Sequence, residues 1–315
     1  MNSQGPVDFG PAGAVQPPPL PGELIRLDDP RTGPVVVYGE IPSAVRLATP
    51  MLLVHSVNAA ASAYEMRPLY QHYKRYRPSY ALDLPGFGLS DRSSRRYTPR
   101  LFTDAVLVAT EEVRRRHDGV PIDVVGLSLG CEFVARAAYE EREAYRSLAL
   151  VSPTGMSGQR RREGPAGSVV GSEFVHTVLA ARLWRRLLFG LLTRPKVVRY
   201  FLRRTFGRRE IDPGLWGYAV RTTKEPGAEH APLYFLSALL FSADITTIYE
   251  GLSMPVWMSH GVRGDFVNYE GAEALLERDD WSREIFATGA LPYFELLDEF
   301  LAAYDEFIAS VDHGR

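Results

Sequence analysis

Short apolar runs alternate with amphipathic stretches along most of this chain, and this alternation narrows the folds open to it. The central runs are apolar throughout, as expected of strands that are covered on both faces. Two early runs, 23–27 and 34–41, have no helix between them and predict an antiparallel hairpin at one sheet edge. The later runs alternate with helical patterns, so a mostly parallel α/β sheet of about eight strands with flanking helices is predicted. The later predicted strands are 50–56, 77–86, 121–130, 145–153, 255–261 and 282–289, and the predicted helices are 62–74, 98–117, 131–143, 268–279 and 293–310.

One segment interrupts this alternation. Residues 155–250 are mostly helical in pattern and lie between two predicted strands. A crossover between parallel strands needs far fewer residues, so the segment is predicted to be an inserted helical cap or lid. Residues 23–154 and 251–315 then form the core. Residues 1–22, rich in proline and glycine, are expected to form a flexible or loosely docked arm.

Composition limits the class of protein. The chain has 315 residues, 45% of them hydrophobic, which is ample for a large core. The formal net charge of −2 predicts no nucleic-acid partner. The single cysteine, Cys131, cannot form an internal disulfide, and residues 1–22 have neither the basic nor the apolar region of a signal peptide. No uncharged apolar run is long enough to span a bilayer. We therefore expect a cytoplasmic protein.

The strongest chemical signal is the sequence Gly126-Leu127-Ser128-Leu129-Gly130, which follows an apolar strand and precedes a helix. This context is typical of a nucleophile elbow, in which a sharp turn exposes the serine hydroxyl at a helix N-terminus. Glycines flank the serine because larger side chains would collide with neighbouring elements. Ser128 is therefore the candidate nucleophile.

A second motif, taken with the serine motif, makes this chain resemble one known superfamily. The stretch "LDLPGFGLSDR" at 82–92 follows a predicted strand and precedes the serine motif. Together they resemble the α/β-hydrolase superfamily over residues 23–310, which implies the α/β-hydrolase fold. We expect Asp83 and Asp91 to cap the loop rather than to act in catalysis.

The resemblance also implies an oxyanion hole after the third strand, in "LLVHSVNAAAS". Carried over, its donors are the backbone N–H groups of Val57 and Leu129. Ser56 stands where the family usually has glycine, so the side chain of Asn58 is an alternative donor. His55 is expected to order the loop.

The family's remaining catalytic residues are an acid and a histidine. The resemblance assigns the acid to Asp265, which would orient an imidazole; the nearby Arg263 could pair with it or bind an anionic substrate. The histidine normally follows the last strand, where this chain has "TGALPYFE". Ala290 occupies the histidine position, and no neighbouring residue is a histidine.

Three residues could replace the missing base. They are His230 in the predicted cap, His260 beside the acid loop, and Tyr293, whose phenol is a weak base. Without a base Ser128 is a poor nucleophile. The first hypothesis is an esterase-like serine hydrolase with an atypical triad. The alternatives are a non-hydrolytic lyase, isomerase or cyclase, and a ligand-binding pseudoenzyme.

The predicted cap has a strong charge bias. Ten arginines or lysines and no acidic residue lie between Glu173 and Glu210, and "LWRRLLFGLL" places Trp184, Leu187, Leu188, Leu191 and Leu192 on one helical face. We expect this face to roof the pocket, with a hydrophobic small-molecule substrate beneath it. Peripheral contact of the basic cap with an anionic membrane is the alternative. No metal-ligand spacing or phosphate-binding loop is seen, so no metal or cofactor is expected.

Overall fold

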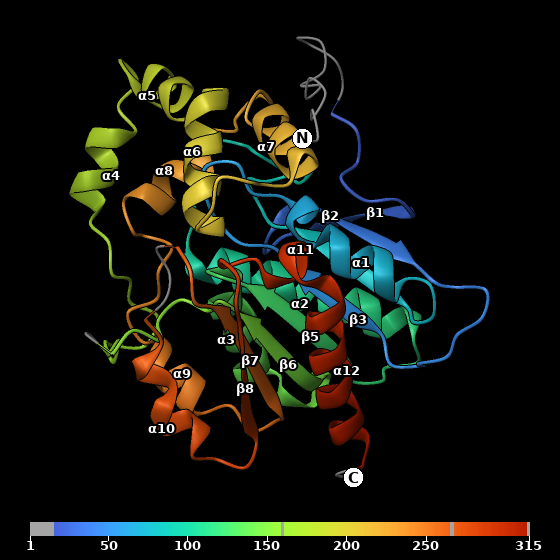
Figure 1. Ribbon diagram of the computed structural model, residues 1–315. Coiled ribbons are helices and arrows are strands. Elements are labelled where there is room, and N and C mark those ends of the chain that lie inside the picture. Colours follow the sequence, from blue (N-terminus) through green and yellow to red (C-terminus); the bar gives the residue numbers. More distant parts are fainter. Residues whose placement is uncertain (1–15, 159–160, 265–267, 314–315) are drawn as a thin grey trace.

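A computed structural model describes residues 16–158, 161–264 and 268–313, and a twisted sheet of eight strands forms its centre (Figure 1). The strand order is β1-β2-β4-β3-β5-β6-β7-β8. β1 pairs antiparallel with β2, β2 pairs antiparallel with β4, and the remaining pairs are parallel. The predicted sheet and its edge hairpin are therefore confirmed. The strands are β1 Glu23–Asp29, β2 Gly33–Glu40, β3 Met51–Val54, β4 Ser79–Asp83, β5 Ile122–Leu127, β6 Tyr145–Val151, β7 Val256–Gly261 and β8 Trp281–Phe286.

The sheet separates two hydrophobic cores. Because side chains of a strand point alternately to opposite faces, Val35 and Val37 of β2 enter one core while Val36 and Tyr38 enter the other. The first core is closed by α2 and α3, and the second by α1 and α12, which lies along the front of the sheet in Figure 1. These helices are α1 Arg67–Tyr73, α2 Pro99–Arg116, α3 Gly130–Glu140 and α12 Leu297–His313; short turns are η1 Ala63–Met66, η2 Arg142–Ala144 and α11 Pro292–Glu295.

One predicted helix is much shorter than its pattern suggested. In place of a helix over 268–279, the chain forms a 3-10 turn, η3 Glu270–Ala272, followed by α10 Glu273–Leu276. The N–H of Gly271 donates to the carbonyl of Met156 at 2.9 Å, and Asn268 Oδ1 accepts from the N–H of Gly158 at 3.1 Å. These contacts with the chain after β6 compete with intrahelical bonds.

The segment between β6 and β7, residues 152–255, is called the insertion below. It contains α4 Glu173–Leu179, α5 Arg185–Leu192, α6 Pro195–Phe206, α7 Pro213–Thr222, α8 His230–Leu236 and α9 Ile245–Glu250. Figure 1 shows α4 to α8 gathered at one end of the sheet, whereas α9 lies beside α3. Buried polar contacts tie the insertion to α3, because Glu132 accepts hydrogen bonds from Arg162 and from the N–H of Ser242.

Part of the predicted N-terminal arm packs onto this end of the molecule. Gln16 is buried and donates to the hydroxyl of Tyr218 on α7 at 2.6 Å, and the hydroxyl of Tyr70 on α1 donates to the carbonyl of Pro21 at 2.9 Å. Residues 1–15 lie outside the described residues. Across the described ranges, none of the helices combines the length and the apolar character needed to cross a bilayer.

A buried ionic network fixes the opposite end of the sheet. Asp123 at the start of β5 is fully buried and binds Arg77 at 2.5 Å, Arg146 at 2.6 Å and the hydroxyl of Ser147 at 2.7 Å. Burial opposes ionisation of Asp123, but the two guanidinium groups outweigh it and hold the pKa of Asp123 below its ordinary value. This end of the sheet therefore depends on a charged carboxylate.

Candidate functional site

Ser128 occupies a strained turn between β5 and α3. Its backbone has φ +53°, a value that residues other than glycine rarely adopt. Its N–H donates to the carbonyl of Val151 at 2.8 Å, and its carbonyl accepts from the N–H of Cys131 at 3.1 Å. These two bonds hold the strained turn in place.

The two glycines of the motif have separate steric reasons. A Cβ at Gly130 would lie 2.4 Å from the carbonyl oxygen of His55, so any side chain would push α3 away from the loop after β3. A Cβ at Gly126 would lie 3.1 Å from the Cα of Cys131 and crowd the turn itself. Glycine is therefore required at positions 126 and 130, because backbone atoms approach closely on both sides of Ser128.

A cavity of about 160 Å³ opens beside Ser128. Val57, Asn58, Leu129 and Ala290 line it together with Ser128, so the structure brings five of the predicted site residues into one place. A volume of this order holds a benzene-sized group. Its walls are mainly apolar, with contributions from Leu127, Leu202, Phe235, Phe241 and Leu291.

The backbone N–H groups of Val57 and Leu129 are available at this cavity. Within the described part of the chain, neither N–H donates a hydrogen bond to another residue. Buried backbone N–H groups are nearly always paired in folded proteins. The residues that carry these two unpaired donors line the same cavity.

The loop after β3 is ordered by His55. Its Nε2 accepts from the N–H of Leu84 at 3.0 Å, so the proton is on Nδ1, which donates to the carbonyl of Ser56 at 2.5 Å. The fully buried ring thus holds two loops together, as expected. Ser56, the next residue, donates its N–H to Glu65 at 2.9 Å.

Asn58 lines the cavity but is engaged elsewhere. Its side-chain amide donates to Ser56 Oγ at 3.0 Å and to Glu65 Oε1 at 2.8 Å, and its Oδ1 accepts from the N–H of Ala60 at 2.8 Å. Both amide hydrogens are therefore used inside the loop. The structure gives Asn58 a role in loop order rather than that of a spare oxyanion donor.

Glu65 is the site residue that the sequence analysis missed. It is 7% exposed, it lines the cavity, and no ion pair links it to a cation within the described residues. It is also the one ionisable side chain among the described residues around this cavity. The sequence does carry a signal, Ser62-Ala63-Tyr64-Glu65, but this pattern predicts a capping box in which the glutamate bonds back to the serine. Instead, Glu65 reaches the N–H of Ser56.

None of the seven histidines, all of which lie in the described ranges, lines the cavity. His230 begins α8, whereas Phe235 of the same helix faces the cavity. His260 stacks on Tyr269 with ring centroids 4.0 Å apart, and its Nδ1 lies 3.0 Å from the carbonyl of Gly261. Burial lowers the pKa of His230 and of His260. Neither histidine lies where a base for Ser128 is needed.

Tyr293 is fully buried and does not line this cavity. Its hydroxyl lies 3.4 Å from the sulfur of Met66, and burial raises its pKa well above the ordinary value. This environment makes a proton-accepting phenolate unfavourable. The role of Tyr293 is to pack α11 against the core.

Glu295 forms a cluster of polar contacts beside the loop after β8. Asp265 lies outside the described residues. Arg263 pairs with Glu295, a nearly buried side chain that also binds Arg208 and accepts from the N–H of Gly289 at 2.7 Å. The pairing of Arg263 is thus with Glu295, a residue that the sequence analysis did not single out.

The insertion covers the cavity with other residues than expected. Leu202 and Thr205 of α6, with Phe235 and Phe241, lie over it. The predicted roof on α5 is wrong, because none of its five side chains lines the cavity. Trp184, Leu187 and Leu191 are exposed to solvent, and Leu188 and Leu192 are half-buried elsewhere. The apolar pattern of α5 was real, but α6 and α8 occupy the positions next to the cavity.

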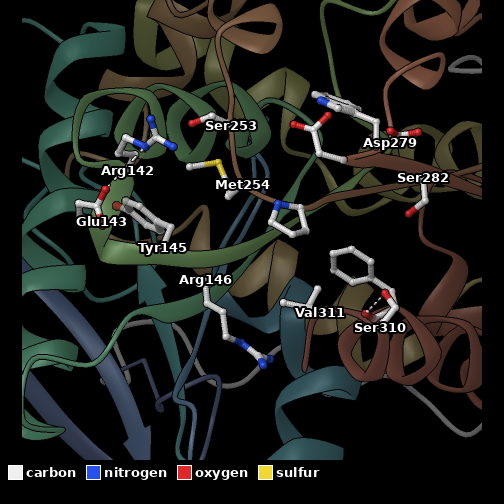
Figure 2. A pocket seen from close by; sticks show the side chains of 14 residues that line it. Arg142, Glu143, Tyr145, Arg146, Ser253, Met254, Asp279, Ser282, Ser310 and Val311 are labelled. Carbon is white, nitrogen blue, oxygen red and sulfur yellow. Dashed lines mark hydrogen bonds and ion pairs between the residues drawn. The ribbon is translucent and has the colours of Figure 1, made fainter. Parts of the chain in front are cut away.

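A second, larger cavity of about 580 Å³ lies at the other end of the strands (Figure 2). Arg142, Tyr145 and Met254 surround it, and Figure 2 shows Ser310 and Val311 of α12 on its far side. It adjoins the N-terminal ends of β6 and β8. Sites in such sheets lie at the carboxyl ends of the strands, where Ser128 is found.

Known proteins share this arrangement of elements. Residues 51–309 match the model described as "Alpha/beta hydrolase family". A probable hydrolytic enzyme from Pseudomonas aeruginosa PAO1 is 17% identical, with a TM-score of 0.70 over 91% of this chain and 94% of that one. A meta-cleavage product hydrolase from Pseudomonas fluorescens IP01 is 17% identical, with a TM-score of 0.64 over 88% and 95%. A serine hydrolase involved in carbazole degradation is 14% identical, with a TM-score of 0.68 over 91% and 99%. At these identities the likeness concerns the fold. No curated protein matches the sequence.

Proposed function

Since this chain belongs to the alpha/beta hydrolase family, we propose that it is a slow, esterase-like enzyme that acts on a small hydrophobic ester through Ser128. The observation that carries this proposal is the backbone of Ser128 at φ +53° beside the unpaired N–H groups of Val57 and Leu129. Such strain costs about 1–3 kcal/mol and is typically retained where a mechanism uses it. The insertion would act as the cap that excludes water.

The cavity suggests how the first step would occur. Ser128 Oγ would attack the ester carbonyl carbon, and the carbonyl oxygen would take up negative charge facing the N–H groups of Val57 and Leu129. Preorganised donors of this kind contribute most at that stage. The hydroxyl proton would pass to water or to the Glu65 carboxylate, because no imidazole lines the cavity. Catalysis of roughly 10³–10⁴-fold over water is expected from such a site, well below that of a complete triad.

Labelling with a fluorophosphonate and turnover of a p-nitrophenyl ester test this proposal on the wild type, Ser128→Ala and Ala290→His. The wild type should label slowly at Ser128, and Ser128→Ala should neither label nor turn over. Ala290→His places an imidazole at the cavity and should raise the rate about 10²-fold or more. Equal turnover by wild type and Ser128→Ala would sink the proposal.

Glu65 favours a second candidate function, proton transfer next to a carbonyl group. A carboxylate base combined with oxyanion donors is the arrangement used to form enolates. Each Glu65 oxygen accepts one hydrogen bond, from Ser56 or Asn58, and keeps a lone pair for a substrate proton. The proton would move from the α-carbon to Glu65, and the enolate oxygen would bind Val57 and Leu129. The proton would then return to carbon, so no bond to Ser128 would form.

A further inference from the structure

The outer helices of the insertion bury very little of their apolar surface. No residue of α4 is buried, and in α5 only Phe189 is. Phe174, Leu183 and Leu187 are 76%, 87% and 66% exposed. A surface helix normally turns its apolar stripe toward the core. These two helices leave theirs in solvent, which points to a partner that covers it.

The same part of the chain is strongly basic. Residues 174–209 contain ten arginines or lysines and no acidic residue. Arg182, Arg194 and Lys196 are exposed, and within the described residues no acidic side chain pairs with them. The apolar side chains therefore project from a surface that attracts anions.

We infer that this outer surface, formed by α4, α5, the linker between them and residues 193–196 at the start of α6, docks peripherally on an anionic lipid surface. A second copy of the chain would bring one basic segment against another, and the repulsion would oppose self-association. A nucleic acid would leave Leu183 and Leu187 in water. An anionic bilayer takes up both features, with leucine and phenylalanine below the headgroups and basic side chains among the phosphates.

The neighbouring helix α6 extends this surface toward the cavity. Tyr200 and Phe201 are 52% and 53% exposed, while Leu202 and Thr205 of the same helix line the cavity. Figure 1 shows α4, α5 and α6 at the same end of the molecule. A docked protein would thus hold its cavity close to the lipid, so that a lipophilic ester could enter from the membrane. This entry route rests on the proposed function, whereas the docking does not.

Sedimentation with vesicles tests the docking. Full-length protein is mixed with phosphatidylcholine vesicles that contain or lack phosphatidylglycerol, at low and high salt. Binding should require phosphatidylglycerol and weaken with salt. The variant Arg182→Gln/Arg194→Gln/Lys196→Gln should bind about 100-fold more weakly, since each charge near such a surface contributes about fivefold. Leu183→Ser/Leu187→Ser should lose roughly tenfold or more.

The matched control alters exposed apolar residues outside the insertion. Ile41 and Val120 are 55% and 40% exposed, and Ile41→Ser/Val120→Ser should bind as the wild type does. All altered side chains are exposed, so thermal melting should be unchanged. The proposal is wrong if the wild type binds neither kind of vesicle or binds both equally. It is also wrong if the control loses as much binding as Leu183→Ser/Leu187→Ser does. It is also wrong if light scattering without lipid shows a dimer that Leu183→Ser/Leu187→Ser converts to a monomer.

Discussion

The backbone N–H of Ala290 donates to the carbonyl oxygen of Thr205 at 2.9 Å, which ties the loop after β8 to the end of α6. On the other side, Ser152 Oγ donates to the carbonyl of Ala290 at 2.9 Å. The resemblance places the family's histidine at Ala290, and these two bonds hold this residue between the end of α6 and Ser152, which directly follows β6. These two bonds give the loop a defined shape.

Replacing Gly289 should loosen this contact. A Cβ at residue 289 would lie 2.4 Å from the carbonyl oxygen of Thr205 and 2.5 Å from the backbone of Phe206, so α6 would have to move. Gly289→Ala should lower the free energy of unfolding by about 1–3 kcal/mol in urea denaturation. Gly190 on α5 has no atom near its added Cβ. The control Gly190→Ala should instead stabilise by about 0.5–1 kcal/mol. Similar losses in both variants would contradict this account.

Glycine at position 128 should stabilise the fold. Relief of the strain at φ +53° contributes about 1–3 kcal/mol, while the added freedom of the unfolded chain costs about 0.4–1 kcal/mol. Ser128→Gly should therefore gain on the order of 1 kcal/mol in thermal or chemical unfolding, and lose all fluorophosphonate labelling. Ser282, exposed on β8 without such strain, is the control, and Ser282→Gly should lose stability. A destabilised Ser128→Gly would show that the turn stores no strain.

Exchange of α-hydrogens for deuterium distinguishes the two candidate functions. Phenylacetone in D₂O, followed by NMR, should exchange faster with the wild type than in buffer if Glu65 acts as a base. Ser128→Ala should retain this activity, and the isosteric Glu65→Gln should lose about 10²-fold or more of it. If Glu65→Gln and wild type exchange equally fast, the carboxylate is not the base.

The Asp123 network predicts acid sensitivity. The pKa of Asp123 is lower in the folded protein than in the unfolded chain, where it is about 3.9. Its ionised form therefore stabilises the fold above that unfolded value, and this contribution disappears as the pH falls through the folded pKa. Asp123→Asn leaves Arg77 and Arg146 without their carboxylate and should cost about 3–5 kcal/mol near neutral pH.

The stability of Asp123→Asn should also fall less steeply on acidification than that of the wild type, as measured by urea unfolding at a series of pH values. The exposed Asp279 provides the control, and Asp279→Asn should change stability by less than about 0.5 kcal/mol. If the free energies of unfolding of wild type and Asp123→Asn change in parallel with pH, Asp123 does not cause the acid sensitivity.

Local patterns were enough to predict the sheet, its edge hairpin and the turn at Ser128. Alternation of buried strands with helices is visible residue by residue, because burial on two faces requires continuous apolar runs. The glycines around Ser128 mark a turn whose sterics are set within a few residues. That Ala290 occupies the family's histidine position stays a prediction from the resemblance, because it rests on the sequence context "TGALPYFE" alone.

The position of Glu65 and the residues that cover the cavity depend on long-range contacts. Glu65 follows a capping pattern in the sequence, yet it binds the N–H of Ser56 in another loop and faces the cavity. The apolar face of α5 was predicted from its period, but α6 and α8 cover the cavity and leave Leu187 exposed. A helical period shows that a face is apolar without naming its partner. The partner depends on contacts between distant segments, and these form only when the whole chain is folded.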